Sequence, residues 1–324
     1  MDSFRILGGK KLGGEIIPQG AKNEALQIIC ATLLTSDKIT INNVPDIKDV
    51  MMLIELLKEL GVKVEKNSKN SFSFSSNKIN LSYLNSNVFF EKAAEIRGSI
   101  MLVGPLLARF KVASFPKPGG DKIGRRRIDT HLNGLKELGA RFTYNNKNFS
   151  YKISTKKLIG KYILLDEASV TGTANIIMAS VLAEGTTTIY NAACEPYVQQ
   201  LCLMINSMGG KISGIGSNMI KIIGVKELNG TTHQILPDMI EIGSFIGLAA
   251  MIFGRWHPVG ALLAALVFGF ADSLQQKLAI LRTPIPSEFL AMAPYLVTII
   301  VVAGIVGNAT PPQAIGKAYV KEGG

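Results

Sequence analysis

The stretch "PKPGGDKIGRRRID", residues 116 to 129, holds the side chains best suited to chemistry. Asp121 follows two glycines, and three consecutive arginines begin at Arg125. Neighbouring arginines repel one another unless an anion joins them, and the guanidinium fork suits phosphate and carboxylate oxygens. Bound anions drive a nearby carboxyl group toward its protonated form, whereas neighbouring arginines favour the charged form; if the anions dominate, the carboxyl can donate a proton. The stretch predicts an anion site with Asp121 as proton donor; the alternative is a plain turn beside a solvated charged face.

Two other segments place cationic residues at expected helix starts. "GAKN" sets Lys22 and Asn23 directly before the apolar segment "EALQIICATLL", and helix N-termini bind anions well. "EIRGSI" sets Arg97 at the corresponding point further along the chain. A cation is mildly unfavourable at a helix start, which favours a functional role for Arg97 over that of an ordinary surface arginine. The matching positions predict one shared central site.

The matching positions of these residues reflect an internal sequence repeat in the first part of the chain. One series ends an apolar helix, turns and enters a β-branched strand: "TLLTSDKITINN" from Thr32, "PLLARFKVASFP" from Pro105 and "SVLAEGTTTIYN" from Ser180. A second series stops a helix at glycine and continues as a strand: "LKELGVKV" from Leu57, "LKELGARF" from Leu135 and "INSMGGKI" from Ile205. The two series keep step at roughly 70 to 78 residues, which predicts three units of two helices and several strands. Such units bury their helices together and set their sheets outward.

Composition narrows the class of protein. The chain has 324 residues, so two or more domains are expected, and 47% hydrophobic with 18% charged residues is typical of a globular protein. The net charge of +11 favours an acidic partner. Because the tryptophan and most aromatic residues lie far from the arginines, a small phosphate ligand is favoured over nucleic acid.

Neither the cysteines nor the histidines have the spacing of metal ligands, so no metal or cofactor is predicted. The cysteines are Cys30, Cys194 and Cys202, and the histidines are His131, His233 and His257. The N-terminus has no apolar signal-peptide core, so a cytoplasmic location is predicted for this part of the chain.

The sequence changes character near residue 252. Residues 289–307 contain no charge over 19 positions, which matches one bilayer crossing. Residues 259–270 form a shorter apolar run that suits a membrane helix, a re-entrant piece or a buried helix. A buried core helix is the alternative for the longer run. Membrane association through residues 259–307 is therefore predicted.

Six motifs stand in order along residues 1–251: "GAKNEAL", "IRGSI", "PGGDKIGRRRID.H", "SVTGTANIIMA", "LAEGTTTIYNAACEP" and "LPDMIEIGSF". Together they resemble the UDP-N-acetylglucosamine 1-carboxyvinyltransferases, the MurA group of enolpyruvyl transferases. The resemblance implies transfer of enolpyruvyl from phosphoenolpyruvate to the 3-hydroxyl of UDP-N-acetylglucosamine, the first committed step of peptidoglycan synthesis. It also implies an inverted α/β barrel domain of three repeats. "GAKN" and "PGG.KIG.R" favour this group over the related shikimate-pathway enzyme.

The resemblance assigns roles to individual residues. Asp121 takes the place of the general acid that protonates the methylene carbon of phosphoenolpyruvate. Lys22 and Asn23 lie at the phosphoenolpyruvate site, and Arg97 and Arg126 belong to the anion pocket. The segment that matches the uridine-nucleotide lining is Arg126, Arg127, Ile128, Asp129 and Thr130, and a second substrate-binding stretch is Glu167, Ala168, Ser169 and Val170. Asp129 has a second local interpretation as the N-cap of the helix before Gly139.

The sequence departs from the family at the loop acid. Most members carry cysteine there, whereas this chain has Asp121. Aspartate keeps a proton donor but lacks the thiol that the epoxide antibiotic fosfomycin alkylates. The resemblance therefore implies resistance of an active form to fosfomycin.

A second departure concerns the domain plan. Residues 1–21 match the first strands of the family's second domain, 22–236 the substrate-binding domain, and 237–251 the start of the second domain. Residues 252–324 instead resemble the C-terminal end of an ABC-type sugar or nucleoside permease. The expected activity is impaired, because two domains normally close on the substrates. A partial permease and a non-catalytic fusion or gene-model artefact are the alternatives.

Overall fold

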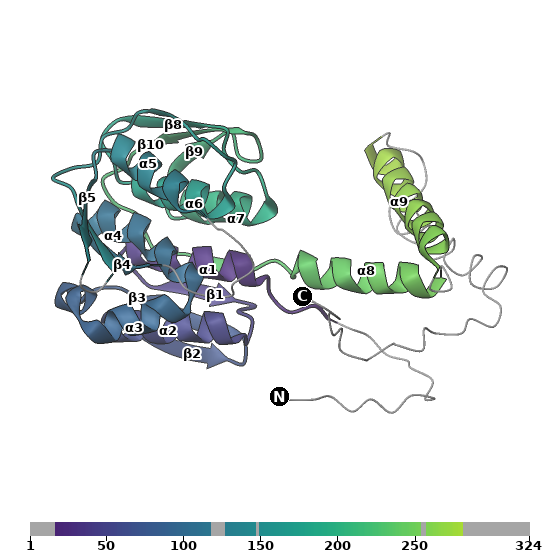
Figure 1. The fold of residues 1–324 in the computed structure, drawn as a ribbon, viewed down its shortest axis with the longest axis horizontal. Coiled ribbons are helices and arrows are strands. Elements are labelled where there is room, and N and C mark those ends of the chain that lie inside the picture. Colours follow the sequence, from purple (N-terminus) through teal and green to yellow (C-terminus); the bar gives the residue numbers. More distant parts are fainter. Residues whose placement is uncertain (1–16, 118–126, 147–148, 254–256, 281–324) are drawn as a thin grey trace, which may run out of the picture. The chain divides into compact units, whose positions relative to one another are not determined.

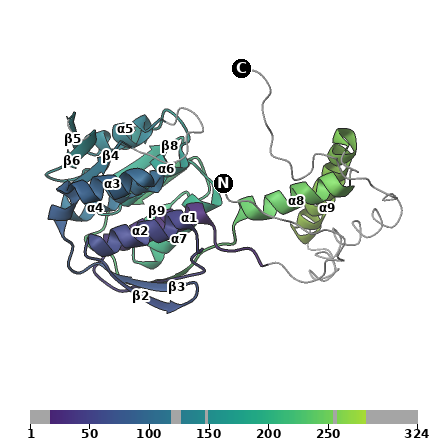
Figure 2. The same ribbon diagram turned by 60° about the horizontal axis from the view of Figure 1, so that its bottom comes forward.

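The computed structural model describes residues 17–117, 127–146, 149–253 and 257–280. The chain divides into two compact units between Asp238 and Met239. In the first unit the helices lie between three sheets (Figures 1 and 2). This arrangement confirms the prediction that the units bury their helices together and set their sheets outward.

The predicted three repeats are present, and each runs helix, strand, helix, strand, strand. The first comprises α1 (Lys22–Ala31), β1 (Ile39–Asn42), α2 (Lys48–Glu59), β2 (Lys63–Ser68) and β3 (Ser71–Ser75). The second comprises α4 (Val103–Phe110), β4 (Val112–Pro116), α5 (Asp129–Glu137), β5 (Arg141–Asn145) and β6 (Ser150–Ser154). The third comprises α6 (Val170–Ser180), β8 (Thr186–Tyr190), α7 (Pro196–Ser207), β9 (Lys211–Ser213) and β10 (Met219–Ile223).

Further elements lie within and between the repeats. The first repeat continues through η1 (Thr32–Leu34) between α1 and β1. Between the first and second repeats the chain forms η2 (Leu81–Asn85), α3 (Asn87–Glu95) and η3 (Arg97–Leu102). β7 (Tyr162–Leu164) precedes the third repeat and β11 (Thr232–Gln234) follows it.

The three sheets share one internal order, β1-β3-β2, β4-β6-β5 and β8-β10-β9, with antiparallel pairing. Two short parallel strands link one repeat to the next. β7 leaves the second repeat and pairs with β8 of the third, and β11 leaves the third repeat and pairs with β1 of the first. The last repeat therefore completes the sheet of the first, and the ring of repeats closes.

The predicted glycine stops are C-terminal turns of equivalent helices. Gly61, Gly139 and Gly209 follow α2, α5 and α7 with φ of +102°, +101° and +97°. Only glycine adopts this left-handed conformation without steric cost from a Cβ atom. The repeated glycine is thus required by backbone geometry, which explains why it marks the repeat so clearly in the sequence.

Replacing Gly139 with alanine is expected to lower the free energy of unfolding by about 1 to 2 kcal/mol, because of backbone strain. A Cβ atom there would meet only the Lys157 carbonyl oxygen, at 3.4 Å. At Gly61 a Cβ atom would lie 2.3 Å from the carbonyl oxygen of Lys78. Gly61→Ala therefore adds a clash to the same strain and costs more. Urea denaturation measures both variants; equal losses would contradict this explanation.

The N-terminus of α1 is hydrogen-bonded to the segment that follows β11. The Ala21 amide donates to the Leu236 carbonyl at 2.8 Å, and the Lys22 amide donates to an Asp238 carboxylate oxygen at 3.2 Å. The fully buried Glu24 lies 2.9 Å from Nε2 of His233 in β11. These contacts fix the start of α1, which carries Lys22 and Asn23.

The second unit contains α8 (Met239–Phe253) and α9 (Pro258–Ile280), which contact each other. α9 includes the predicted apolar run 259–270, and its leucines 262, 263 and 266 are exposed. Within the described part of the chain, no helix combines the length and apolar character that crossing a membrane requires. The other predicted span, residues 289–307, lies outside the described residues.

Candidate functional site

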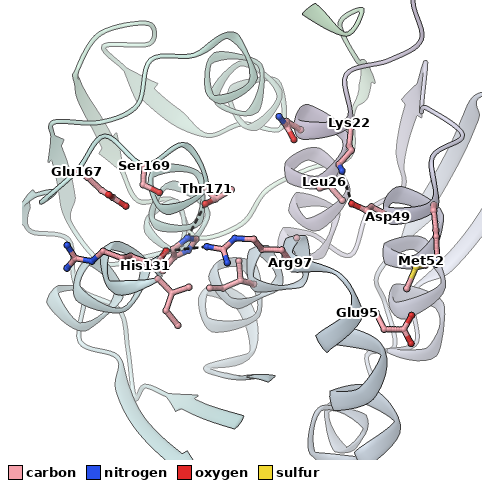
Figure 3. Close-up of a pocket in the computed structure, with 16 residues that line it drawn as sticks. Lys22, Leu26, Asp49, Met52, Glu95, Arg97, His131, Glu167, Ser169 and Thr171 are labelled. Carbon is pink, nitrogen blue, oxygen red and sulfur yellow. Dashed lines mark hydrogen bonds and ion pairs between the residues drawn. The ribbon is translucent and has the colours of Figure 1, made fainter. Parts of the chain in front are cut away.

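A cavity of about 650 Å³ lies in the first unit where parts of all three repeats meet. Its walls come from the starts of α1 and α2, from η3, from the residues that lead into α5, and from the segment before and at the start of α6. Figure 3 shows side chains from these elements pointing toward a common space. The repeat architecture thus brings together helix starts that are far apart in sequence.

One wall carries an ion pair between the first two helices. Nζ of Lys22 lies 2.8 Å from a carboxylate oxygen of Asp49, and both side chains are partly exposed (Figure 3). Lys48 and Asn23 also line this wall. Since the pair is exposed to solvent and to the cavity, an entering anion can compete with Asp49 for Lys22. Sequence reasoning found Lys22 but not its counter-ion.

Arg97 and Arg127 line another part of the cavity. Nη2 of Arg97 donates to the Arg127 carbonyl at 3.4 Å, so the two residues are directly linked. Nε of Arg127 donates to Asp129 at 2.7 Å, and this hydrogen bond raises the pKa of the exposed guanidinium. Two guanidinium groups on one cavity supply the planar donors that phosphate and carboxylate ligands require.

The first residues of α5 differ in part from expectation. Asp129 is the first residue inside α5, and the N-cap is Ile128, without a side-chain hydrogen bond. The prediction that Asp129 is the N-cap is therefore wrong, because its carboxylate pairs with Arg127 instead. Thr130 is buried and donates to Asp166 at 2.8 Å. It lines a separate cavity of about 400 Å³.

A network of buried hydrogen bonds leads from the core to two residues that line the cavity, His131 and Thr171. The Gly104 amide donates to Oδ1 of Asn175 at 2.6 Å, and Nδ2 of Asn175 donates to the Ile100 carbonyl at 2.9 Å. Nδ2 also lies 3.1 Å from Nδ1 of His131, whose Nε2 is 3.1 Å from Oγ1 of Thr171. Burial, and secondly the charge of Arg97, lower the pKa of His131 to about 4. His131 is therefore neutral at neutral pH.

Most of the predicted site residues that the structure describes line one cavity, and a few do not. Those that line the 650 Å³ cavity are Lys22, Asn23, Arg97, Arg127, Ile128, Glu167 and Ser169. Ala168 and Val170 belong to the same segment but are not among the lining residues. Asp121 and Arg126 lie outside the described residues. Sequence reasoning missed Asp49, His131 and Thr171, and the "H" that closes the motif "RRRID.H" was the one available signal for His131.

A family of carboxyvinyltransferases matches most of this chain, including all three repeats and the residues that line the cationic cavity. The chain belongs to the family described as EPSP synthase (3-phosphoshikimate 1-carboxyvinyltransferase), which matches residues 6–280.

Relatives named UDP-N-acetylglucosamine 1-carboxyvinyltransferase are closely similar in sequence. The protein of Bacteroides fragilis is 62% identical over 251 residues, covering 78% of this chain and 58% of the relative. The protein of Porphyromonas gingivalis is 59% identical over 251 residues, with the same two coverages. The chain thus spans less than two thirds of the length of these relatives.

Solved structures support the fold. The enolpyruvyl transferase NikO from Streptomyces tendae superposes with a TM-score of 0.63 and 20% identity, covering 74% of this chain and 56% of that one. An EPSP synthase from Acinetobacter baumannii gives a TM-score of 0.56 and 18% identity, covering 74% of this chain and 53% of that one. The α/β fold expected from the repeats is therefore shared with these proteins.

Proposed function

We propose that this chain carries a substrate-binding domain that acts in the transfer of enolpyruvyl from phosphoenolpyruvate to the 3-hydroxyl of UDP-N-acetylglucosamine. The main support is the convergence of Lys22, Arg97 and Arg127 on one cavity. Both substrates are anions, and both need cationic donors at fixed positions. The relatives that are 62% identical over 251 residues carry the name of this activity.

The proposed roles are those that the resemblance implies, and seven of the residues concerned line the cavity. Lys22 and Asn23 bind phosphoenolpyruvate, with Arg97 and Arg126 completing the anion pocket. The nucleotide sugar lies against residues 126–130 and 167–170. Asp121 donates the proton to the methylene carbon of phosphoenolpyruvate, the role that the resemblance gives to this position.

Calorimetric titration with UDP-N-acetylglucosamine tests binding, and phosphate release from phosphoenolpyruvate tests turnover. We expect weak binding, and phosphate release that is slow or undetectable and that requires UDP-N-acetylglucosamine. Domain closure normally completes such sites, and the match covers 58% of the length of these relatives. Absence of nucleotide-sugar binding, or phosphate release independent of it, would overturn the proposal.

Fosfomycin tests the proposed role of Asp121. The chain is expected to gain no covalent mass with the epoxide at position 121, because a carboxylate is a far weaker nucleophile than a thiolate. Asp121→Cys supplies the thiol and is expected to gain the mass of one fosfomycin in the presence of UDP-N-acetylglucosamine. Intact-mass spectrometry and peptide mapping measure both. Labelling of Asp121 itself would contradict the prediction.

The domain plan and the permease-like origin of residues 252–324 are further proposals. The unit boundary between Asp238 and Met239 supports the domain boundary near residue 236, and the apolar composition of residues 252–324 supports the permease-like origin. Membrane association through residues 259–307 belongs to the same proposal. One amplicon of genomic DNA across the codons for residues 230–270 tests the junction. A continuous reading supports the fusion, whereas continuation into further transferase sequence overturns it.

A further inference from the structure

The orientation of the Asn175 amide is fixed by the main chain. The Gly104 amide can only donate, so the atom 2.6 Å away must be the oxygen, Oδ1. Nδ2 then faces two acceptors, the Ile100 carbonyl and the His131 ring. Asn175 is fully buried, as is expected of an amide whose hydrogen bonds are all made within the protein.

This orientation determines the tautomer of His131. Nδ2 of Asn175 is a donor, so Nδ1 of His131 must accept and carries no hydrogen. The neutral ring then bears its hydrogen on Nε2, which lies 3.1 Å from Oγ1 of Thr171. Hence His131 donates and the Thr171 hydroxyl accepts. The direction of this bond is therefore fixed by the Gly104 amide, acting through the side chains of Asn175 and His131.

Thr171 keeps one hydrogen to donate. It lies at the start of α6, is exposed and lines the 650 Å³ cavity, with His131 beside it in Figure 3. No second hydrogen-bond partner of its hydroxyl is found within the described residues. A hydroxyl whose lone pair is engaged by a fixed donor presents its hydrogen elsewhere, and the open side here is the cavity.

We propose that the Thr171 hydroxyl is a substrate-binding donor, aimed into the cavity by His131, and that it donates to an anionic phosphate oxygen. Arg97 and Arg127 line the same cavity and favour an oxygen that only accepts. His131 is a positioning residue that acts through Thr171. The identity of the ligand, a nucleotide diphosphate or the phosphate of phosphoenolpyruvate, rests on the proposed function.

Thr171→Val tests the donor because it removes the hydroxyl and nearly keeps the shape. We expect its affinity to fall about 10- to 100-fold for the ligand that Thr171 contacts, as for a lost hydrogen bond to a charged group. Thr171→Ser is expected to restore affinity to within about threefold. The matched control is Thr186→Val on β8, at an exposed position away from the cavity. Calorimetric titrations with UDP-N-acetylglucosamine and, separately, with phosphoenolpyruvate identify the ligand.

A second measurement tests the positioning step without ligand. Long-range ¹H–¹⁵N spectra of the free chain should show His131 with a protonated Nε2 and a bare Nδ1, unchanged from about pH 6 to 8. The opposite tautomer overturns the proposal, and so does wild-type affinity of Thr171→Val for every ligand that the wild type binds.

If the wild type binds phosphoenolpyruvate through Thr171 but not the nucleotide sugar, this inference stands and the proposed acceptor substrate fails. If the wild type binds neither, both fail.

Discussion

Asn175→Ala is expected to lower the free energy of unfolding by about 3 to 5 kcal/mol, the largest stability loss we predict for a single side chain. The truncation leaves the Gly104 amide and Nδ1 of His131 without their hydrogen-bond partner in the core, whereas the Ile100 carbonyl keeps the bond from the Val103 amide. Each buried polar group that loses its partner carries its own desolvation cost, which is why the sum exceeds that of one ordinary hydrogen bond.

Urea denaturation of the purified chain measures this loss. The matched control is Asn133→Ala on α5, whose side chain is exposed, and it should change the free energy of unfolding by no more than about 0.5 kcal/mol. A loss below about 1 kcal/mol for Asn175→Ala would show that the buried network contributes little to stability. It would also remove the structural basis for a fixed His131 tautomer.

Arg97→Met is expected to weaken anion binding about 30- to 100-fold. This is the largest effect on affinity that we predict at the 650 Å³ cavity. Methionine keeps much of the aliphatic stem but removes the charged donors. The effect should be similar for phosphoenolpyruvate and for inorganic phosphate, because the lost interaction is with anionic oxygen. Calorimetric titration measures it, with Arg141→Met on the exposed position of β5 as the charge-matched control. Unchanged affinity for both anions would exclude Arg97 from the anion site.

The same variant has an independent readout in His131. Burial is the main cause of the low pKa of this ring, and the positive charge of Arg97 lowers the pKa further. Removing that charge should raise the pKa of His131 from about 4 toward its ordinary value, while burial keeps it below that value. NMR titration of the ring can detect this rise even if no ligand binds.

The repeats could be predicted from sequence because local rules fix their boundaries. Glycines such as Gly61 and Gly139 must adopt positive φ, and β-branched segments follow the turns, so the same pattern recurs in each unit. The strands β7 and β11 could not be predicted in the same way. Each has three residues, too few for a periodic pattern, and each pairs with a strand of another repeat. Their pairing is a tertiary property.

The site was predictable where a residue type is unusual for its position. Lys22 and Arg97 stand at helix starts, where cations are disfavoured, and both line the cavity. His131 and Thr171 gave no such signal, since a histidine and a threonine are ordinary within helices. Their connection depends on Asn175, which lies 44 residues from His131 and is brought to it only by the packing of α5 on α6. Asp129 was misassigned because its carboxylate pairs with Arg127 rather than capping the helix.

The closure of the ring through β11 has a consequence for synthesis on the ribosome. β1 lies between β3 and β11 in the completed sheet, so the first repeat exposes an unpaired strand edge until residues 232–234 have been translated. At elongation rates of about 5 to 20 residues per second, the intervening 190 or so residues leave that edge open for roughly 10 to 40 seconds. An open edge of this kind invites pairing with a neighbouring nascent chain. Early chaperone engagement would therefore matter most for the segment that is translated first.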